Sequence, residues 1–303
     1  MSATPTPHHH HSRPLDSIGV ALALLLCLSW GFNQVAVKLT LHDIPPQLQG
    51  AIRSVIAALL VAGYCRLRGI PLLARDGTLW PGVIAGTLFG CEFACIYQGL
   101  SYTTATRGAL FMYLAPFFVV ILARVFLPAD KFKLWQWIGL CLSFAGMIVA
   151  FGLPTPALDP RQMLGDTLIV IAAMGWAITT VVIKASRLNT ISPEKVMMYQ
   201  LVMSAPIMGL AAYAAGETIT RWPDAQAIGW MAYQTVWVVA VTFVIWFALI
   251  KKYSANRLSA FTVLTPLFGV AAGHFMLGDP LTPAFLAAVA MVAAGLILVN
   301  RAR

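Results

Sequence analysis

Ten apolar stretches of about 20 residues follow one another along this chain of 303 residues, separated only by short polar connections. Stretches of this length match the thickness of the hydrocarbon core of a lipid bilayer. In hydrocarbon every backbone N–H and C=O group must be satisfied within the segment, and a helix does this. Hydrophobic residues make up 59% of the chain and charged residues only 10%, whereas soluble domains carry about 25% charged residues.

The sequence therefore predicts an all-α integral membrane protein with ten transmembrane helices. A disordered tail is predicted for residues 1–15, where the run His8–His11 lies among Pro and Thr residues. The five cysteines lie in or beside apolar spans without metal-ligand spacing, so no metal or cofactor is expected. The predicted spans are residues 16–38, 45–65, 79–101, 105–127, 133–152, 165–187, 193–215, 226–250, 255–277 and 282–300.

The distribution of basic residues predicts the orientation of these helices. The formal net charge is +9, but in a membrane protein Lys and Arg mark the cytoplasmic side, so this charge does not indicate nucleic-acid binding. With the N-terminus placed in the cytoplasm, fifteen of the 20 Lys and Arg residues fall on the cytoplasmic side. This predicts that both termini are cytoplasmic. The five on or near the other side are Lys38, Arg53, Arg107, Arg161 and Arg221.

The second half of the chain repeats the first. Sliding the sequence by 146 residues superposes WGFNQVAVK (30–38) on WAITTVVIK (176–184). A shift of 150 superposes ATRGALFMYLAPFFVV (105–120) on ANRLSAFTVLTPLFGV (255–270). The common order and nearly constant offset of these matches indicate duplication.

The two copies are predicted as residues 16–152 and 165–300. Further along, a shift of 149 pairs Gly146 with Gly295. Each copy has five helices, an odd number, so the second copy must enter the membrane from the opposite side. Inverted repeats of this kind are typical of secondary transporters, whose binding site lies between the halves near the bilayer midplane.

Several motifs resemble the drug/metabolite transporter superfamily, in its ten-helix EamA group. They are LSWGFNQVAVK in the first span, IPPQLQGAIRSVIAALL leading into the second, QGLSYTTATRGALFMYLAPFFVVILARVFL and NRLSAFTVLTPLFGVAAGHFMLGD. The resemblance covers residues 16–300, and within the group it is strongest to YddG-type exporters of aromatic amino acids. Where the family often has Gly-Glu turns, this chain has Ala129–Asp130 and Gly278–Asp279.

The resemblance implies a multi-pass carrier of the bacterial inner membrane, and no enzyme. It implies export of aromatic and other apolar amino acids by alternating access through a central cavity. The implied partners are an amino-acid substrate and the lipid bilayer, with no nucleic acid and no cofactor, and the protein is expected to function as a monomer.

One face of the first span carries Trp30, Asn33, Gln34 and Lys38 at steps of three or four residues. The two amides are expected to line a wet cavity, or else to form hydrogen bonds between helices. Trp30 and its counterpart Trp176 are expected either to contact substrate or to anchor at the membrane interface. Lys38 and its counterpart Lys184 either gate the two membrane sides or extend to the lipid headgroups.

Glu92 is the one acidic residue deep within a span. A lone charge at the bilayer centre costs at least about 2.5–3.5 kcal/mol, so Glu92 must be protonated, hydrated or paired. Arg53 is a possible partner by the resemblance. Glu92 either couples transport to protons, binds a substrate ammonium, or forms a structural pair near Gly86 and Gly90, which permit close helix approach.

Pro116 and Pro266 occupy equivalent places in the middle of their spans. Each removes a backbone hydrogen bond and can bend its helix, so the pair is predicted to provide hinges. The further side chains expected to line the cavity are Tyr97, Gln98, Tyr113, Tyr199, Trp237 and Phe268.

Three other functions stay open from the residues. Aromatic faces also attract lipophilic cations, as in a multidrug exporter. An exchanger of phosphorylated metabolites needs two converging basic groups, for which Lys38, Lys184 and Arg53 are candidates. An intramembrane enzyme is less well supported, because His274 is the only histidine of the second half and no cluster has ligand spacing. No phosphate-binding loop is present in the sequence, which argues against direct drive by ATP.

Overall fold

The computed structural model describes residues 16–126, 134–151, 159–242, 245–246, 249 and 264–301. Throughout these ranges the chain forms helices joined by turns, without any strand, and the predicted all-α fold is confirmed. Five helices are long and apolar enough to cross a bilayer. They are α1 (Ser17–Thr40), α2 (Pro46–Leu67), α3 (Leu79–Tyr102), α7 (Pro160–Ala185) and α8 (Pro193–Ala214).

Shorter helices lie in the described parts of the other predicted spans. The fourth span consists of two pieces, and the eighth begins as an α-helix and continues as a π-helix. The elements are α4 (Ala105–Met112), α5 (Ala115–Phe126), α6 (Leu134–Phe151), the 3-10 helix η1 (Arg187–Thr190), α9 (Ala225–Ala232), the π-helix η2 (Tyr233–Val241), α12 (Leu264–Leu277) and α13 (Pro283–Arg301).

Prolines and side-chain caps define where several helices begin. Pro46 and Pro193 are the first residues of α2 and α8, where a missing N–H has no consequence because the first turn has no partner for it. Thr104 and Ser192 cap α4 and α8 by accepting hydrogen bonds from backbone N–H groups in the first turn. These caps satisfy backbone donors that would otherwise be unpaired at a helix start.

A stripe of glycines lets α3 approach α8 closely. Gly82, Gly86 and Gly90 recur every four residues, so they share one face of the helix. A Cβ atom on Gly86 would lie 2.4 Å from the carbonyl oxygen of Tyr199, and one on Gly90 would lie 3.0 Å from the Cα of Ser204. Close backbone approach of this kind is the usual basis of helix association in membranes.

We expect Gly86→Ala to destabilise the protein by about 1–3 kcal/mol, the usual effect of overpacking. The atom that the new methyl group meets belongs to the backbone of α8 and cannot rotate away. Gly63→Ala in α2 is the matched control, because nothing lies within 4 Å of that position. Thermal unfolding in detergent should show a lower midpoint for the first variant only; equal midpoints would contradict close packing at Gly86.

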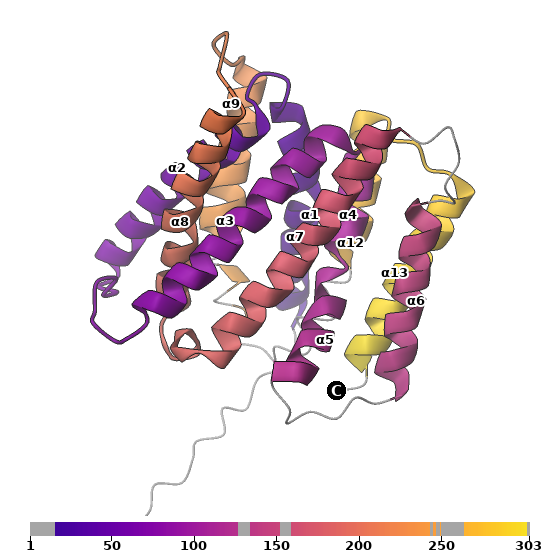
Figure 1. The fold of residues 1–303 in the computed structure, drawn as a ribbon, viewed down its shortest axis with the longest axis horizontal. Coiled ribbons are helices and arrows are strands. Elements are labelled where there is room, and N and C mark those ends of the chain that lie inside the picture. The colour runs from indigo at the N-terminus through magenta and orange to yellow at the C-terminus, as the bar shows by residue number, and fades with distance from the viewer. Residues whose placement is uncertain are drawn as a thin grey trace, which may run out of the picture.

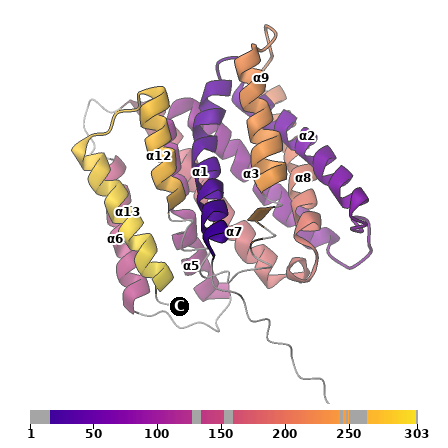
Figure 2. The same cartoon turned by 180° about the vertical axis from the view of Figure 1, so that it is seen from behind.

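The helices form a bundle with the pair α2 and α8 at one edge and the pair α6 and α13 at the other (Figure 1). Between these pairs lie α1, α3, α4, α7 and α12. Seen from behind, α1 begins and α13 ends at the same end of the bundle (Figure 2). We call this the proximal end and the opposite one the distal end.

The edge pair α6 and α13 packs around two glycines. A Cβ atom on Gly146 would lie 3.0 Å from the carbonyl oxygen of Ala288, and one on Gly295 would lie 2.5 Å from the carbonyl oxygen of Gly139. Because the later residue of α6 faces the earlier residue of α13, the two helices run antiparallel.

The pair α2 and α8 is antiparallel as well. The Ser204 hydroxyl lies 2.9 Å from the Ser54 hydroxyl, while Gly50, one turn earlier in α2, faces Met208, one turn later in α8. The helices α4 and α12 are also antiparallel, because Ala109 faces Gly269 and the earlier residue Thr106 faces the later residue Gly273.

The fourth span is interrupted in its middle. Tyr113 and Leu114 form a turn between α4 and α5, and Pro116 is the second residue of α5. Pro116 therefore stands in the first turn of a new helix, where its missing N–H is tolerated. Pro266 likewise lies in the first turn of α12, but the preceding residues 251–263 are outside the described part of the chain. The hinge role of both prolines stays a prediction.

Candidate functional site

A series of buried hydrogen bonds crosses the middle of the bundle from α2 to α1. The Arg53 side chain donates to the Tyr97 hydroxyl over 3.1 Å, and that hydroxyl donates to the Gln234 side chain over 3.0 Å. Gln234 in turn donates to the Thr40 hydroxyl over 3.0 Å. The Arg53 guanidinium also lies 4.5 Å above the ring centre of Phe93. We call Arg53, Phe93, Tyr97 and Gln234 the central cluster.

Several polar atoms of α1 and α2 are buried without a hydrogen-bond partner among the described residues. They include the Nε of Arg53 and the side-chain oxygens of Asn33, Gln34, Gln47 and Gln49. An unsatisfied buried polar group costs about 1–3 kcal/mol. These atoms can therefore bind water or a polar ligand without first giving up a protein partner.

Glu92 lies in α3 directly before Phe93 and is 2% exposed. Neither of its carboxylate oxygens has a hydrogen-bond partner within the described part of the chain, and its Cβ faces Gly175 of α7. Among the described residues Arg53 interacts with it electrostatically, but no ion pair within 4.0 Å joins the two. The expected direct pairing of Glu92 with Arg53 is not formed here, because the guanidinium turns to Tyr97 and Phe93 instead.

A second polar group lies at the distal end. The Arg107 guanidinium donates to the Asp166 carboxylate over 2.9 and 2.5 Å, and Asp166 is fully buried. The Thr103 hydroxyl donates to the same carboxylate over 2.5 Å, and Lys38 donates to the Thr103 carbonyl over 2.6 Å. We call Lys38, Thr103, Arg107 and Asp166 the distal network; it joins α1 and the α3–α4 turn to α7.

The distal end is also tied to the turn before α13. The backbone N–H of Thr106 donates to the Asp279 carboxylate over 2.9 Å, and the Thr106 hydroxyl donates to the same oxygen. Nearby, the Asp43 carboxylate accepts from Arg221 over 2.5 Å and from the backbone of Asp224 over 2.8 Å. These hydrogen bonds lower the pKa of Asp43 to about 2, and contacts between the halves thus hold the distal end together.

The structure places Trp30 and Trp237 between α1 and the eighth span. The Trp30 indole donates to the Thr242 hydroxyl over 2.9 Å, and its ring stands edge-on to Trp246 at 5.4 Å between centres. The Trp237 indole donates to the Ser29 hydroxyl over 2.9 Å. Both indoles take part in helix packing at these contacts.

Other predicted site residues make no hydrogen bond to the central cluster that the structure records. Trp176 is 42% exposed, Lys184 is exposed near the end of α7, and Tyr113 lies in the turn between α4 and α5. The Tyr199 hydroxyl lies 3.1 Å from that of Thr78, and its ring packs on Gly82. Their assigned roles stay predictions.

Some polar side chains that form buried or partly buried hydrogen bonds here, inside the central cluster (Gln234) and outside it (Gln47 and Gln49), were not singled out by the sequence. Gln47 donates to the Gln98 side chain over 3.3 Å, Gln49 donates to the Val37 carbonyl over 3.3 Å, and Gln234 comes from the π-helix. The segment IPPQLQGAIR holds two of these amides, but their spacing of two residues places them on different helix faces. The pattern therefore gives no signal of a common site.

A bundle of apolar helices around buried, unsatisfied polar groups is the architecture of a membrane transporter. The sequence profile of the EamA-like transporter family matches residues 17–152 and again residues 163–301. The chain belongs to this family and contains two copies of its unit, and the family expected from the sequence motifs is confirmed.

Individual relatives match nearly the whole chain. A Salmonella typhimurium protein named "Probable amino-acid metabolite efflux pump" is 27% identical over 290 residues, 91% of this chain and 93% of that protein. A protein of Escherichia coli with the same name is 23% identical over 288 residues, 91% of this chain and 93% of that protein. The Bacillus subtilis "Uncharacterized transporter YoaV" is 22% identical over 272 residues, 89% of this chain and 92% of that protein.

One solved structure, described as "Crystal structure of protein", superposes with a TM-score of 0.65 at 19% sequence identity. The match covers 94% of this chain and 96% of the other. This likeness supports the fold alone.

Proposed function

We propose that the protein exports aromatic and other apolar amino acids across the bacterial inner membrane. In this proposal it acts as a monomeric carrier and has no enzymatic activity. Two relatives bear the name of amino-acid metabolite efflux pumps, which is consistent with substrates of this class.

The observation that carries the proposal is the environment of Arg53. It is a buried cation with an unpaired Nε, next to two aromatic rings and close to the unpaired carboxylate of Glu92. A zwitterionic amino acid offers a carboxylate to Arg53 and an ammonium group to Glu92. An aromatic side chain adds ring contacts worth about 0.5–1.5 kcal/mol each, so the central cluster suits all three parts of such a substrate.

We further propose that the two copies are inverted and alternately open at either end. The shift of 149 pairs Gly146 with Gly295 and residue 139 with residue 288. In the structure Gly146 faces residue 288 and Gly295 faces residue 139, so the two contacts are equivalent. Such reciprocal contacts are expected around a two-fold axis. The antiparallel order of two equivalent helix pairs, α2 with α8 and α6 with α13, supports the same arrangement. In this proposal the distal network closes one end while the substrate is exchanged at the other.

Counterflow in proteoliposomes tests the proposed substrate class. Vesicles preloaded with unlabelled phenylalanine should take up labelled phenylalanine faster than empty vesicles, and unlabelled Phe, Tyr or Trp should compete. Competition by organic cations alone would favour a multidrug exporter, and competition by sugar phosphates alone would favour a phosphorylated-metabolite exchanger. Either result would overturn the amino-acid proposal.

Glu92 is proposed to couple export to protons, because its carboxylate has no hydrogen-bond partner among the described residues. The Gln side chain can still accept a hydrogen bond from a substrate ammonium but cannot release a proton. We therefore expect Glu92→Gln to retain counterflow but to lose any response to an imposed pH gradient. Asp159→Asn, at an exposed position before α7, is the control and should keep the response. A wild-type response to the gradient in the Glu92 variant would refute the coupling role.

Both termini are proposed to be cytoplasmic, as the distribution of Lys and Arg predicts. Alkaline phosphatase is active only outside the cytoplasm. We therefore expect a fusion after Arg303 to be inactive and a fusion inserted after Thr218, in the turn between α8 and α9, to be active. The opposite pattern would reverse the assigned orientation.

A further inference from the structure

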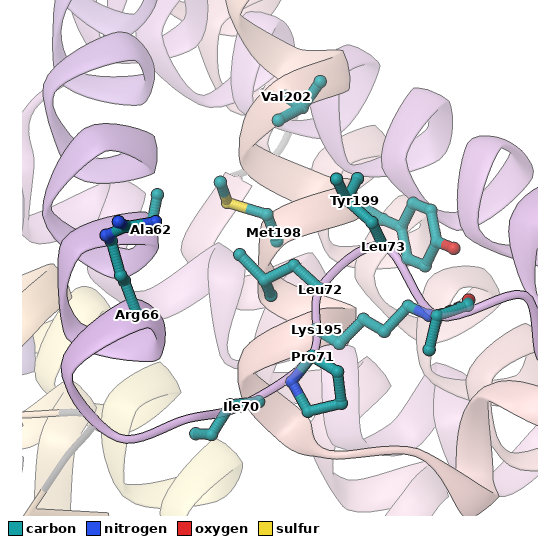
Figure 3. A pocket seen from close by; sticks show the side chains of 11 residues that line it. Ala62, Arg66, Ile70, Pro71, Leu72, Leu73, Lys195, Met198, Tyr199 and Val202 are labelled. Carbon is teal, nitrogen blue, oxygen red and sulfur yellow. Dashed lines mark hydrogen bonds between the residues drawn. The ribbon is translucent and has the colours of Figure 1, made fainter.

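An apolar groove of about 790 Å³ opens at the proximal end of the bundle. One wall is the last part of α2, the floor is the loop 70–74, and the other wall is the first half of α8 (Figure 3). The groove lies at the edge of the bundle that α2 and α8 form (Figure 1), apart from Arg53 and Tyr97, which do not line it.

The lining of the groove is suited to hydrocarbon. Leu72 and Met198 point into it from the loop and from α8 (Figure 3). At its rim, Leu73 is 96% exposed and Val202 is 51% exposed. Apolar side chains so exposed on the outside of a membrane bundle meet acyl chains, because water is not their neighbour there.

Two basic side chains border the groove, and they differ in their partners. Lys195 is buried and already neutralised, because it donates to the Asp76 carboxylate over 2.7 Å and to the Ala74 carbonyl over 2.8 Å. This contact lowers the pKa of Asp76 to about 2. The Arg66 guanidinium, in contrast, is exposed and has no ion-pair partner within 4.0 Å among the described residues.

The surroundings of Arg66 are positive. Arg68 and Arg75 are exposed on the same segment. Apart from Asp76, which pairs with Lys195, the acid near this end of α2 is Glu194, which interacts electrostatically with Cys65. Residues 66–75 thus carry three exposed arginines and no acid, on the side where the cytoplasmic leaflet carries negative lipids in the proposed orientation.

We propose that this groove binds an anionic phospholipid, with an acyl chain along Leu72, Met198 and Val202 and the phosphate paired with Arg66. The planar guanidinium can contact two phosphate oxygens at once. A second copy of the chain would bring like-charged arginines together, which disfavours that occupant. The site is separate from the substrate site and does not depend on the proposed export activity.

Thermal unfolding of the full chain in a constant detergent tests the proposal without any transport measurement. Phosphatidylglycerol and phosphatidylcholine with identical acyl chains are titrated, and the lipid concentration giving half-maximal stabilisation is measured. For the wild type we expect this concentration to be about fivefold lower for phosphatidylglycerol, the effect of one basic side chain near a membrane surface. Arg66→Gln should remove this preference and leave the response to phosphatidylcholine unchanged.

Two further variants make the test specific. Arg161→Gln removes an exposed arginine at the start of α7, at the other end of the bundle, and should keep the preference. Ala62→Phe fills the groove next to Arg66 and should weaken the response to both lipids. Because Arg66 is exposed, Arg66→Gln should not change the midpoint of thermal unfolding in the absence of lipid. An unchanged midpoint shows that the variant is folded.

Four results would overturn the proposal. The first is an unchanged preference for phosphatidylglycerol in Arg66→Gln, and the second is an equal response of the wild type to the two lipids. The third is loss of this preference when inorganic phosphate alone is added, which would assign the site to a free anion. The fourth is a dimeric mass of the purified protein that Ala62→Phe converts to a monomeric one, which would assign the groove to a second copy.

Discussion

Replacing Arg53 with alanine is expected to raise the phenylalanine concentration needed for half-maximal counterflow by about 10- to 150-fold. A hydrogen bond to a charged group contributes about 1.5–3 kcal/mol, and this range corresponds to that factor. Arg53 is the buried cation of the central cluster, and its Nε has no protein partner to occupy it. The variant removes the group proposed to hold the substrate carboxylate.

A substrate without a carboxylate separates binding from a structural effect. Phenylalanine amide keeps the ring and the ammonium group, so its half-maximal concentration should change little in the Arg53 variant. Arg161→Ala, which removes an exposed arginine, should leave the half-maximal concentration of both substrates unchanged. If the half-maximal concentration rises equally for phenylalanine and its amide, Arg53 acts by positioning Tyr97 and Gln234, and its role in binding the substrate carboxylate is wrong.

The sequence was sufficient for the positions of the five long spans, because lipid imposes one rule on every segment that crosses it. The start of α2 at Pro46 and that of α8 at Pro193 follow from local chemistry in the same way. The break at Tyr113 and Leu114 was only partly foreseen. Pro116 predicted a bend there, whereas the chain forms a turn and starts a new helix.

The central cluster could be predicted only in part, because it depends on contacts between distant helices. Tyr97 and Gln98 were identified as polar side chains in an apolar span; Tyr97 accepts a buried hydrogen bond from Arg53, and Gln98 accepts a partly buried one from Gln47. Gln234 was not identified, since it reaches Tyr97 from a π-helix that no pattern in the sequence predicts. A period of 3.6 residues misassigns the faces of such a segment.

The same limit applies to the distal network. Lys38 was identified from its place at the end of an apolar face, but Asp166 was not, because it lies six residues into α7 and 59 residues from Arg107. Duplication gave no help here, since residue 20, its counterpart under the shift of 146, is a valine. This ion pair joins the two copies, and its counterpart, Arg257 with Val20, lacks the acid, so a comparison of the two halves gives no sign of it.

Breaking the distal network should open the distal end. Removing one partner of a buried ion pair costs about 3–5 kcal/mol, and Asp166 is fully buried beneath Arg107 and Thr103. In Asp166→Ala the closed form therefore loses stability relative to the open one. We expect a cysteine placed at Gln98, in a background without native cysteines, to react at least about tenfold faster with an impermeant maleimide added from the distal side.

A double-mutant cycle decides whether the Arg107–Asp166 pair itself holds the distal end closed. Arg107→Ala alone should also accelerate labelling, but in the double variant the second exchange should add little, because the charge it removes has already lost its partner. Arg161→Ala should leave the labelling rate unchanged. Independent, additive effects of the two exchanges would contradict a role for the pair. Wild-type labelling rates in folded single variants would show that the distal end is held closed by other contacts, such as that between Thr106 and Asp279.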